Sequence, residues 1–476
     1  MMRYVAGIAA ALAVAAAATA GVARAATAPA VQWCGTGVST ADLADAVAGP
    51  QIHVIYAIPS DGVDRFPLIS TGISTDLTAG VSWWQRQDFS RAPRFDLAAF
   101  PCFPSLGALD ISDVRLPHDS SYYSGSAALF DAISGDLVAA GFQNVHKKYL
   151  VYYDSPSPLP PGTCGRGAEN TTNGGADGYA EVYLAPNLKS EPTEIGCGNI
   201  ESPDDRGGYS AIVAVHELIH TFGALDTTHT PGPPHACPGD ANAHAHACDN
   251  PLDIMYSGGG QYWLDNRYLD YGNDDYYGMP VSDTWWDVQD SIWLRHLNEP
   301  TYTLDLTAGV GAASTTSDLP GVDCRGSAHC VSTWDANTAV MLTAAPANGY
   351  ARVQWGGACA SAGSSPDCTL TMSANQKVTV SYTRQLAVAS FAAPRQTGTR
   401  LQARLTLSRR PLAGEARLAC RATPGLKLVS HAIAGTVATC VWSIPKRLRG
   451  RRVSGRVTVN TDSGASLGGG FALKLR

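Results

Sequence analysis

Hydrophobic positions over residues 26–300 follow two alternating patterns. Continuous or alternating apolar runs predict buried strands at residues 52–58, 149–153 and 178–184. Helical spacing predicts helices at residues 77–87, 126–141, 208–223 and 285–297. Strands and helices that interleave in this way indicate an α/β (α+β) domain.

After residue 300 the pattern changes to strands and turns only. Residues 302–384 contain Leu342-Thr-Ala-Ala-Pro-Ala followed by Val353-Gln-Trp-Gly-Gly-Ala-Cys359, which resembles a small bacterial β repeat module of cell-surface proteins. The last stretch alternates apolar and polar residues and fits a small β-sandwich. We therefore expect two small all-β domains, at residues 301–385 and 386–476, after the domain at residues 26–300.

The N-terminus predicts a signal peptide over residues 1–25. Arg3 precedes an almost wholly apolar run at residues 5–22, and Ala23 and Ala25 are small residues at the cleavage positions. A membrane anchor is the alternative, because the run nears the ~20 residues of a span. Its alanine-rich content favours cleavage and a secreted, extracellular protein.

The cysteine content also indicates an oxidising compartment. The chain has 12 cysteines, an even number that suits disulfides. Cys34 has an alternative role as a thiolate that blocks a metal site. The expected pairs join sequence neighbours: Cys34–Cys102, Cys164–Cys197, Cys237–Cys248, Cys324–Cys330, Cys359–Cys368 and Cys420–Cys440.

Charge is unevenly distributed along the chain. The net charge is −7, yet residues 386–476 hold 16 lysines and arginines against only Glu415 and Asp462. Clustered positive charge attracts anionic cell-wall material or membranes. A soluble domain that is merely rich in arginine is the alternative.

The main chemical signal is His216-Glu217-x-x-His220. Residues four apart share one face of a helix, so the two imidazoles can bind one metal ion, and Glu217 can act as a general base. Gly223 allows a left-handed turn after the helix, which would bring Asp226 under the metal. The alternative is a helix whose histidines only pack or form hydrogen bonds.

The motif His216-Glu217-x-x-His220-x-x-Gly223-x-x-Asp226, followed by Met255, resembles the metzincin clan of zinc endopeptidases. The aspartate in place of a third histidine is similar to the snapalysin group of small secreted bacterial proteases. The resemblance implies zinc bound by His216, His220 and Asp226, Glu217 as catalytic base and Met255 as an apolar floor. Tyr256 directly follows Met255 and departs from the tyrosine position of some members, so it receives no role. The resemblance also implies that the strand at residues 179–184 forms the upper edge of the cleft and pairs with an extended substrate.

Other polar residues leave alternatives open. One loop histidine could replace Asp226 as third ligand, or these histidines could form a second metal site or simply be solvated. They are His229, His235, His244 and His246. An oxygen-rich segment could hold Ca²⁺ or be an ordinary polar loop. It contains Asp265, Asn266, Asp270, Asn273, Asp274 and Asp275.

The sequence therefore predicts a secreted zinc endopeptidase that acts on protein or peptide substrates. We expect a monomer that binds no nucleic acid. One alternative is a catalytically inactive cell-surface adhesion or binding protein with a protease-like domain. Hydrolysis of a non-peptide amide is another.

Overall fold

The computed structural model describes most of the chain after the N-terminal segment. The described residues are 31–35, 39–125, 129–157, 159, 164–168, 178–184, 206–225, 235–237, 246–256, 263–279, 287–326, 328–462 and 464–476. The predicted signal peptide lies outside them. No helix in these ranges is long and apolar enough to span a membrane.

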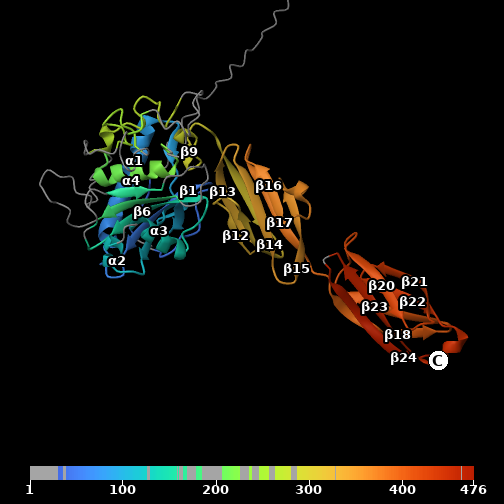
Figure 1. Cartoon of the computed structure of the whole chain (residues 1–476). Coiled ribbons are helices and arrows are strands. Elements are labelled where there is room, and N and C mark those ends of the chain that lie inside the picture. Colours follow the sequence, from blue (N-terminus) through green and yellow to red (C-terminus); the bar gives the residue numbers. More distant parts are fainter. Residues whose placement is uncertain are drawn as a thin grey trace, which may run out of the picture.

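The first part of the chain is mixed α/β, and the remainder is β-rich (Figure 1). Its described elements in the first part are β1 (Gln51–Ile58), α1 (Phe66–Gln87), β2 (Arg91–Pro93), β3 (Leu97–Phe100), β4 (Phe103–Leu109), β5 (Ile111–Arg115), α2 (Ser120–Gly125), α3 (Leu129–Ala139), β6 (Lys147–Asp154), β7 (Gly165–Gly167), β8 (Tyr179–Leu184), α4 (Tyr209–Thr221), the 3₁₀ turns η1 (Leu264–Asn266) and η2 (Val288–Asp290), and β9 (Leu294–His296).

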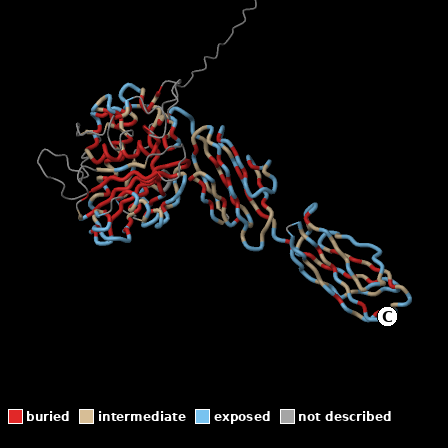
Figure 2. Tube along the Cα trace, in the orientation of Figure 1, coloured by how far each residue is buried: buried red, intermediate tan, exposed pale blue. Residues whose placement is uncertain are grey.

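A five-stranded sheet organises this part, in the order β5-β1-β6-β8-β7. The first four strands are parallel, and β7 is antiparallel to β8. Helices α1 and α4 cover one face, and α2 and α3 cover the other (Figure 1). Burial on both faces explains why β1 and β6 have no exposed residue, as expected for parallel strands between helices (Figure 2).

The position of β8 corrects one expectation. The strand at residues 179–184 forms as predicted, but it does not lie at the edge of the sheet, because β7 pairs with its outer side. The short β7 has only three residues, two of them glycine, and carries no apolar alternation that the sequence could reveal. The described edge beside α4 is therefore β7.

The helix expected at residues 285–297 is also corrected. The described part forms η2 and β9 instead, while residues 285 and 286 lie outside the described residues. Asp287 caps η2 by accepting the Gln289 N–H, and β9 pairs antiparallel with β2. Trp293 and Leu294 are each 1% exposed. Strand pairing and burial therefore outweigh the helical spacing of the apolar residues here.

The β-rich remainder forms two regions, each with its own hydrophobic cluster. The first contains two four-stranded sheets, ordered β13-β10-β17-β15 and β12-β11-β14-β16. Strand β14 alternates buried and exposed residues, as a sheet with one solvated face requires. The elements are β10 (Thr301–Ala308), β11 (Ala312–Ser317), β12 (Asp323–Arg325), β13 (His329–Asp335), β14 (Ala339–Pro346), β15 (Tyr350–Gly357), η3 (Ala360–Ala362), β16 (Asp367–Thr371) and β17 (Gln376–Arg384).

The second β region packs a four-stranded sheet, β18-β19-β22-β21, against a three-stranded sheet, β20-β23-β24. This two-sheet arrangement agrees with the expected small sandwich. Its elements are β18 (Val388–Thr397), β19 (Arg400–Leu407), β20 (Ala416–Ala422), β21 (Lys427–Ala434), β22 (Val437–Ser443), η4 (Lys446–Leu448), β23 (Arg452–Thr461) and β24 (Ser466–Lys474). The boundaries at residues 300 and 385 stay a prediction.

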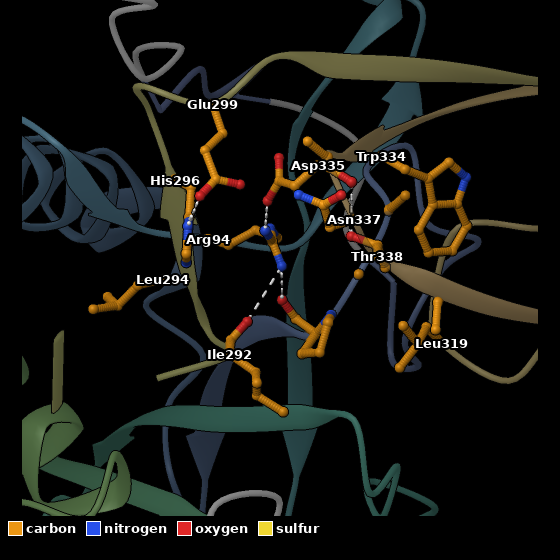
Figure 3. Close-up of a pocket in the computed structure, with 15 residues that line it drawn as sticks. Arg94, Ile292, Leu294, His296, Glu299, Leu319, Trp334, Asp335, Asn337 and Thr338 are labelled. Carbon is orange, nitrogen blue, oxygen red and sulfur yellow. Dashed lines mark hydrogen bonds and ion pairs between the residues drawn. The ribbon is translucent and has the colours of Figure 1, made fainter. Parts of the chain in front are cut away.

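A buried ion pair joins the mixed α/β part to the first β region. Arg94 is 7% exposed and pairs with Asp335 of β13 (Figure 3). Its Nη1 also donates to the carbonyl oxygens of Pro50, at 3.0 Å, and Ile292, at 3.3 Å. A cavity of about 450 Å³ lies at this junction. The junction is thus fixed by specific polar contacts.

Five disulfides confirm the expected local pairing, including Cys34–Cys102, which removes Cys34 as a free thiolate. Cys164 is also disulfide-bonded, and its expected partner Cys197 lies outside the described residues. The disulfide content is that of an exported protein.

Candidate metal centre

Helix α4 brings His216 and His220 onto one face, because one helical turn separates them. Their Nε2 atoms lie 3.2 Å apart. Two nitrogens that bind one tetrahedral zinc, each at about 2.0–2.1 Å, are about 3.3–3.4 Å apart. The observed separation therefore fits two ligands of a single zinc ion.

A backbone carbonyl fixes the tautomer of His216. The Nδ1 atom of His216 lies 2.7 Å from the carbonyl oxygen of Ile254. A carbonyl can only accept, so Nδ1 carries the proton and Nε2 of the neutral ring keeps its lone pair. Burial is the main cause that lowers the pKa of His216 to about 3 and that of His220 well below its usual value. Both rings are thus neutral at pH 7, as metal ligands must be.

A third imidazole faces this pair. The His246 ring stacks on His216 with a centroid separation of 5.2 Å and meets His220 edge-on at 5.3 Å. The ligand atoms of the three histidines all lie within 4.8 Å of one another. His246 is therefore placed as a third nitrogen donor, and three such donors leave one tetrahedral position for water.

A disulfide-linked hairpin carries His246. The N–H of Cys237 donates to the carbonyl of His246 at 3.0 Å, and Cys237 is bonded to Cys248. The Ala247 N–H donates to the carbonyl of Met255 at 3.1 Å, which ties the hairpin to the turn beside His216. The sequence offered four loop histidines without distinguishing His246, because only this tertiary contact selects it.

The helix end agrees with the predicted turn. Gly223 has φ of 96°, and its N–H and that of Ala224 donate to the carbonyls of His220 and Ile219. This pair of bonds is the Schellman arrangement, which requires a left-handed residue. Asp226, the predicted third ligand, lies outside the described residues, as do His229 and His244. Its role stays a prediction.

Glu217 is buried on the same helix, with 7% of its surface exposed. Burial is the main cause that raises its pKa to about 8, while the Gly167 N–H and Arg166 act in the opposite direction. A cation at the neighbouring histidines also favours the charged carboxylate. Glu217 can therefore hold and release a proton near neutral pH.

Strand β7 lies directly against these residues. A Cβ atom on Gly167 would lie 2.4 Å from the carbonyl oxygen of Glu217 and 2.7 Å from the Cβ of His220. One on Gly165 would lie 2.8 Å from the Cγ of Glu217. This strand is not among those predicted from the sequence, although glycine at alternate positions is a signal of close backbone approach.

Met255 lies in a tight turn as expected, because the Tyr256 N–H donates to the carbonyl of Asp253 at 3.2 Å. Its side chain is 0% exposed and belongs to the same core cluster as α4. The neighbouring Ile254 carbonyl accepts the bond from His216. The floor role of Met255 stays a prediction.

The predicted oxygen-rich segment does not form one cluster around a single point. Asp265 pairs with Arg86, and Asp270 accepts the backbone N–H groups of residues 274–277. Asp274 and Asp275 instead lie beside His235. The six residues predicted to bind Ca²⁺ therefore do not form a single site.

Another acidic cluster, inside the mixed α/β part, contains basic side chains of its own. Lys147 Nζ lies 2.7 Å from carboxylate oxygens of Asp42, Asp45 and Asp96. His53 Nδ1 lies 2.8 Å from Asp96. Lys147 and His53 thus compensate part of the negative charge of this cluster, and its role is structural.

One segment of the chain is similar to a known family of domains. No curated protein matches the chain. The family model of the divergent InlB B-repeat domain matches residues 323–386. This match supports the β repeat module expected from the sequence.

Among solved structures, the chain is similar to wild-type OgpA from Akkermansia muciniphila, with 10% identity, a TM-score of 0.27 and coverage of 91% of this chain and 95% of that one. Catalytically inactive OgpA, solved with an O-glycopeptide (glycodrosocin) substrate, matches with 10% identity, a TM-score of 0.26 and coverage of 92% and 98%. BcpA, the major pilin subunit of Bacillus cereus, matches with 10% identity, a TM-score of 0.18 and coverage of 37% and 69%. TM-scores this low leave the function to be argued from the site itself.

Proposed function

We propose that the chain is an exported zinc-dependent endopeptidase. The observation that carries this proposal is the 3.2 Å separation of the Nε2 atoms of His216 and His220, with a third imidazole against both. Glu217 follows the first of these histidines. A helix that only packed its histidines would not require a third imidazole from a distant segment and a buried carboxyl beside them.

The reaction needs an activated water and a group that moves its proton. When bound, zinc supplies Lewis acidity and lowers the pKa of a coordinated water. The Glu217 carboxylate takes the proton of the attacking water and later gives it to the leaving amine. The Gly167 N–H donates to this carboxylate and holds it in place. The Ile254 carbonyl keeps His216 in the tautomer that binds metal through Nε2.

His246 is the third ligand in this proposal, in place of the predicted Asp226. Three imidazoles are a known donor set for catalytic zinc. The disulfide and the backbone pairing of its hairpin hold His246 against the helix. Asp226 remains the competing assignment, and paired variants decide between them.

The β7 edge of the sheet, as far as the described strands define it, supplies the substrate platform. An extended peptide that adds to a sheet needs a strand at its edge. Strand β7 holds that position among the described strands and contacts Glu217 and His220. We therefore assign substrate pairing to β7 rather than to β8.

The last β region anchors the protein to an anionic polymer in this proposal. A hollow of about 730 Å³ is lined by Arg395, Arg449, Lys474 and Arg476, with no acidic residue. The only two acidic residues of this region are paired elsewhere, Glu415 with Arg409 and Asp462 with Arg352 of the neighbouring region. Positive charge is thus left to face solvent at the hollow. Disulfides and the B-repeat match support an extracellular location.

A cleavage assay on casein tests the enzymatic proposal. Purified protein should cleave casein, and a zinc chelator should abolish cleavage until zinc is restored. Glu217→Gln should lose activity by at least about 100-fold, the lower range for a general base, while it retains bound zinc. No cleavage by zinc-loaded wild type would favour the inactive adhesion protein.

A further inference from the structure

The hairpin that presents His246 also carries a second histidine. His235 precedes the isolated bridge between Ala236 and Ala247, and its carbonyl accepts the Cys248 N–H at 2.8 Å. His246 lies at the opposite corner of the same hairpin and faces the helix histidines. The position of His235 and that of His246 are therefore mechanically linked through one disulfide-bonded hairpin.

Three carboxylates surround His235. Its Nδ1 lies 3.1 Å from Asp275 Oδ1 and 3.8 Å from Asp274 Oδ2. Asp249 completes a group whose ligand atoms all lie within 4.8 Å of one another. One imidazole and three carboxylates thus converge from two separate segments, the hairpin and the loop at residues 270–277.

This group has no counterpart of Lys147 among the described residues, and the basic side chain that faces its carboxylates is that of His235. Among the described residues, no lysine or arginine forms an ion pair with Asp249, Asp274 or Asp275. The side chain of Asp275 is 0% exposed, and one of its oxygens, Oδ2, is enclosed without a hydrogen-bond donor. Asp274 Oδ1 also has no hydrogen-bond donor, although the Asp274 side chain is 47% exposed. Buried carboxylate oxygens are ordinarily paired or bind a cation.

The loop that supplies these oxygens is held in position independently. Asp270 uses its own carboxylate to accept the N–H groups of Asp274, Asp275, Tyr276 and Tyr277. Burial, followed by the nearby Asp270, raises the pKa of Asp275 to about 6. The Asp275 carboxylate is therefore held in place with Oδ1 against the backbone N–H and imidazole of His235, while Oδ2 has no hydrogen-bond donor.

We propose that His235, Asp249, Asp274 and Asp275 bind a second divalent transition-metal ion of the Zn²⁺ type, which fixes the hairpin that presents His246. Zn²⁺ accepts nitrogen and oxygen ligands in a four-coordinate site, whereas Ca²⁺ takes six to eight oxygens. The imidazole in this set thus favours Zn²⁺ over Ca²⁺. The site itself is independent of the proposed peptidase activity, and only its effect on His246 rests on that function.

Metal stoichiometry tests the site. The full-length secreted protein, dialysed against Zn²⁺ and analysed by atomic emission, should hold two equivalents. Asp249→Asn combined with Asp274→Asn should hold one, and these two positions are chosen because neither side chain is buried. His216→Ala combined with His220→Ala should also hold one equivalent, and the combination of all four changes should hold none. Asp290→Asn, an exposed residue of the same region with the same charge change, should still hold two.

Calorimetric titration with Zn²⁺ and with Ca²⁺ separates the remaining outcomes. The proposal is overturned if wild type binds one equivalent only, if the second equivalent survives Asp249→Asn with Asp274→Asn, or if Ca²⁺ alone fills the second site. These outcomes differ from failure of the proposed function, in which zinc-loaded wild type holds its metal but cleaves nothing. Loss of the second equivalent should also weaken binding at the His216 site by about 10- to 100-fold, the size of effect that supporting groups have on a metal site.

Discussion

The Nε2 atom of His216 faces the Nε2 atom of His220 at 3.2 Å, while the opposite side of the His216 ring is held by the backbone of Ile254. Neither ring can turn away without breaking the packing of α4 or this bond. The pair is therefore preorganised for a cation, and preorganised ligands need little rearrangement when the ion binds.

The third ligand is decided by two alanine variants. His246→Ala should lower zinc affinity by at least about 100-fold, because the loss of a ligand should exceed the 10- to 100-fold effect of supporting groups. Asp226→Ala should retain zinc and activity if His246 is the ligand. Zinc titration against a competing chelator measures both. The reverse result, with zinc lost only in Asp226→Ala, would restore the assignment expected from the sequence.

The close approach of β7 predicts that Gly167→Ala abolishes activity. The added Cβ would lie 2.4 Å from the carbonyl oxygen of Glu217, so strand or helix must shift and carry Glu217 away from the reacting water. We expect a loss of at least about 100-fold in kcat/KM, since a displacement of 1 Å in a catalytic site is worth that much. Peptide hydrolysis at saturating zinc measures it.

Gly135→Ala is the matched control. Gly135 lies exposed in α3, and nothing lies within 4 Å of an added Cβ. This change should leave kcat/KM unaffected and increase the free energy of unfolding by up to about 1 kcal/mol, because alanine is the better helix former. Equal losses in both variants would show that the role of β7 is not specific.

The cluster around Lys147 predicts a pH-dependent loss of stability. Burial alone would raise the pKa of Asp96, but Lys147 and His53 outweigh burial and lower it to about 2. The resulting stabilisation is complete above the unfolded pKa of 3.8 and is lost as the pH falls toward 2. Lys147→Met leaves buried carboxylates uncompensated and should lower the free energy of unfolding by about 3–5 kcal/mol at pH 7.5.

In the Lys147→Met variant the stability regained on acidification is larger than in the wild type, in which burial already raises the pKa of Asp45 to about 7 and that of Asp110 to about 6. Uncompensated buried carboxyls have raised pKa values, so the folded state binds protons first and regains stability on acidification. Its deficit relative to wild type should therefore shrink between pH 7.5 and pH 5 in urea unfolding. Arg86→Met breaks an exposed pair with Asp265 in the same domain and should cost at most about 1 kcal/mol. A deficit that grows on acidification would contradict the assignment.

The basic hollow predicts site-specific retention on a polyanion. Serine in place of Arg395, Arg449, Lys474 and Arg476 should shift elution from immobilised heparin to clearly lower salt, because exposed charges act within a Debye length of about 10 Å. Serine at four exposed strand arginines, Arg404, Arg417, Arg421 and Arg456, removes the same charge elsewhere. An equal change in the eluting salt concentration for both variants would show that retention depends on net charge and not on the hollow. Binding to anionic lipid vesicles but not to heparin would identify a membrane partner instead.

The two helix histidines could be predicted from the sequence because their positions relative to each other depend only on the helix that contains them. Four residues of spacing place His216 and His220 together in any helix, and Gly223 marks where that helix ends. His246 could be predicted only as one of four candidate loop histidines, since a disulfide and a backbone contact far along the chain bring it to the helix. Strand β7 could not be predicted because a strand of three residues shows no periodic pattern of apolar side chains. The helix expected at residues 285–297 was wrong because pairing with β2 decides its conformation.

The ion pair between the buried Arg94 and Asp335 ties the first β region to the mixed α/β part, and the basic hollow belongs to the far end of the row of modules in Figure 1. If the hollow binds a polymer, the proposed metal centre and the attachment site lie at opposite ends of the chain of modules. The enzyme would then cleave proteins close to its attachment site without degrading the polymer to which it is bound. The length of the two β modules would set the distance between the attachment site and the cleaved bond.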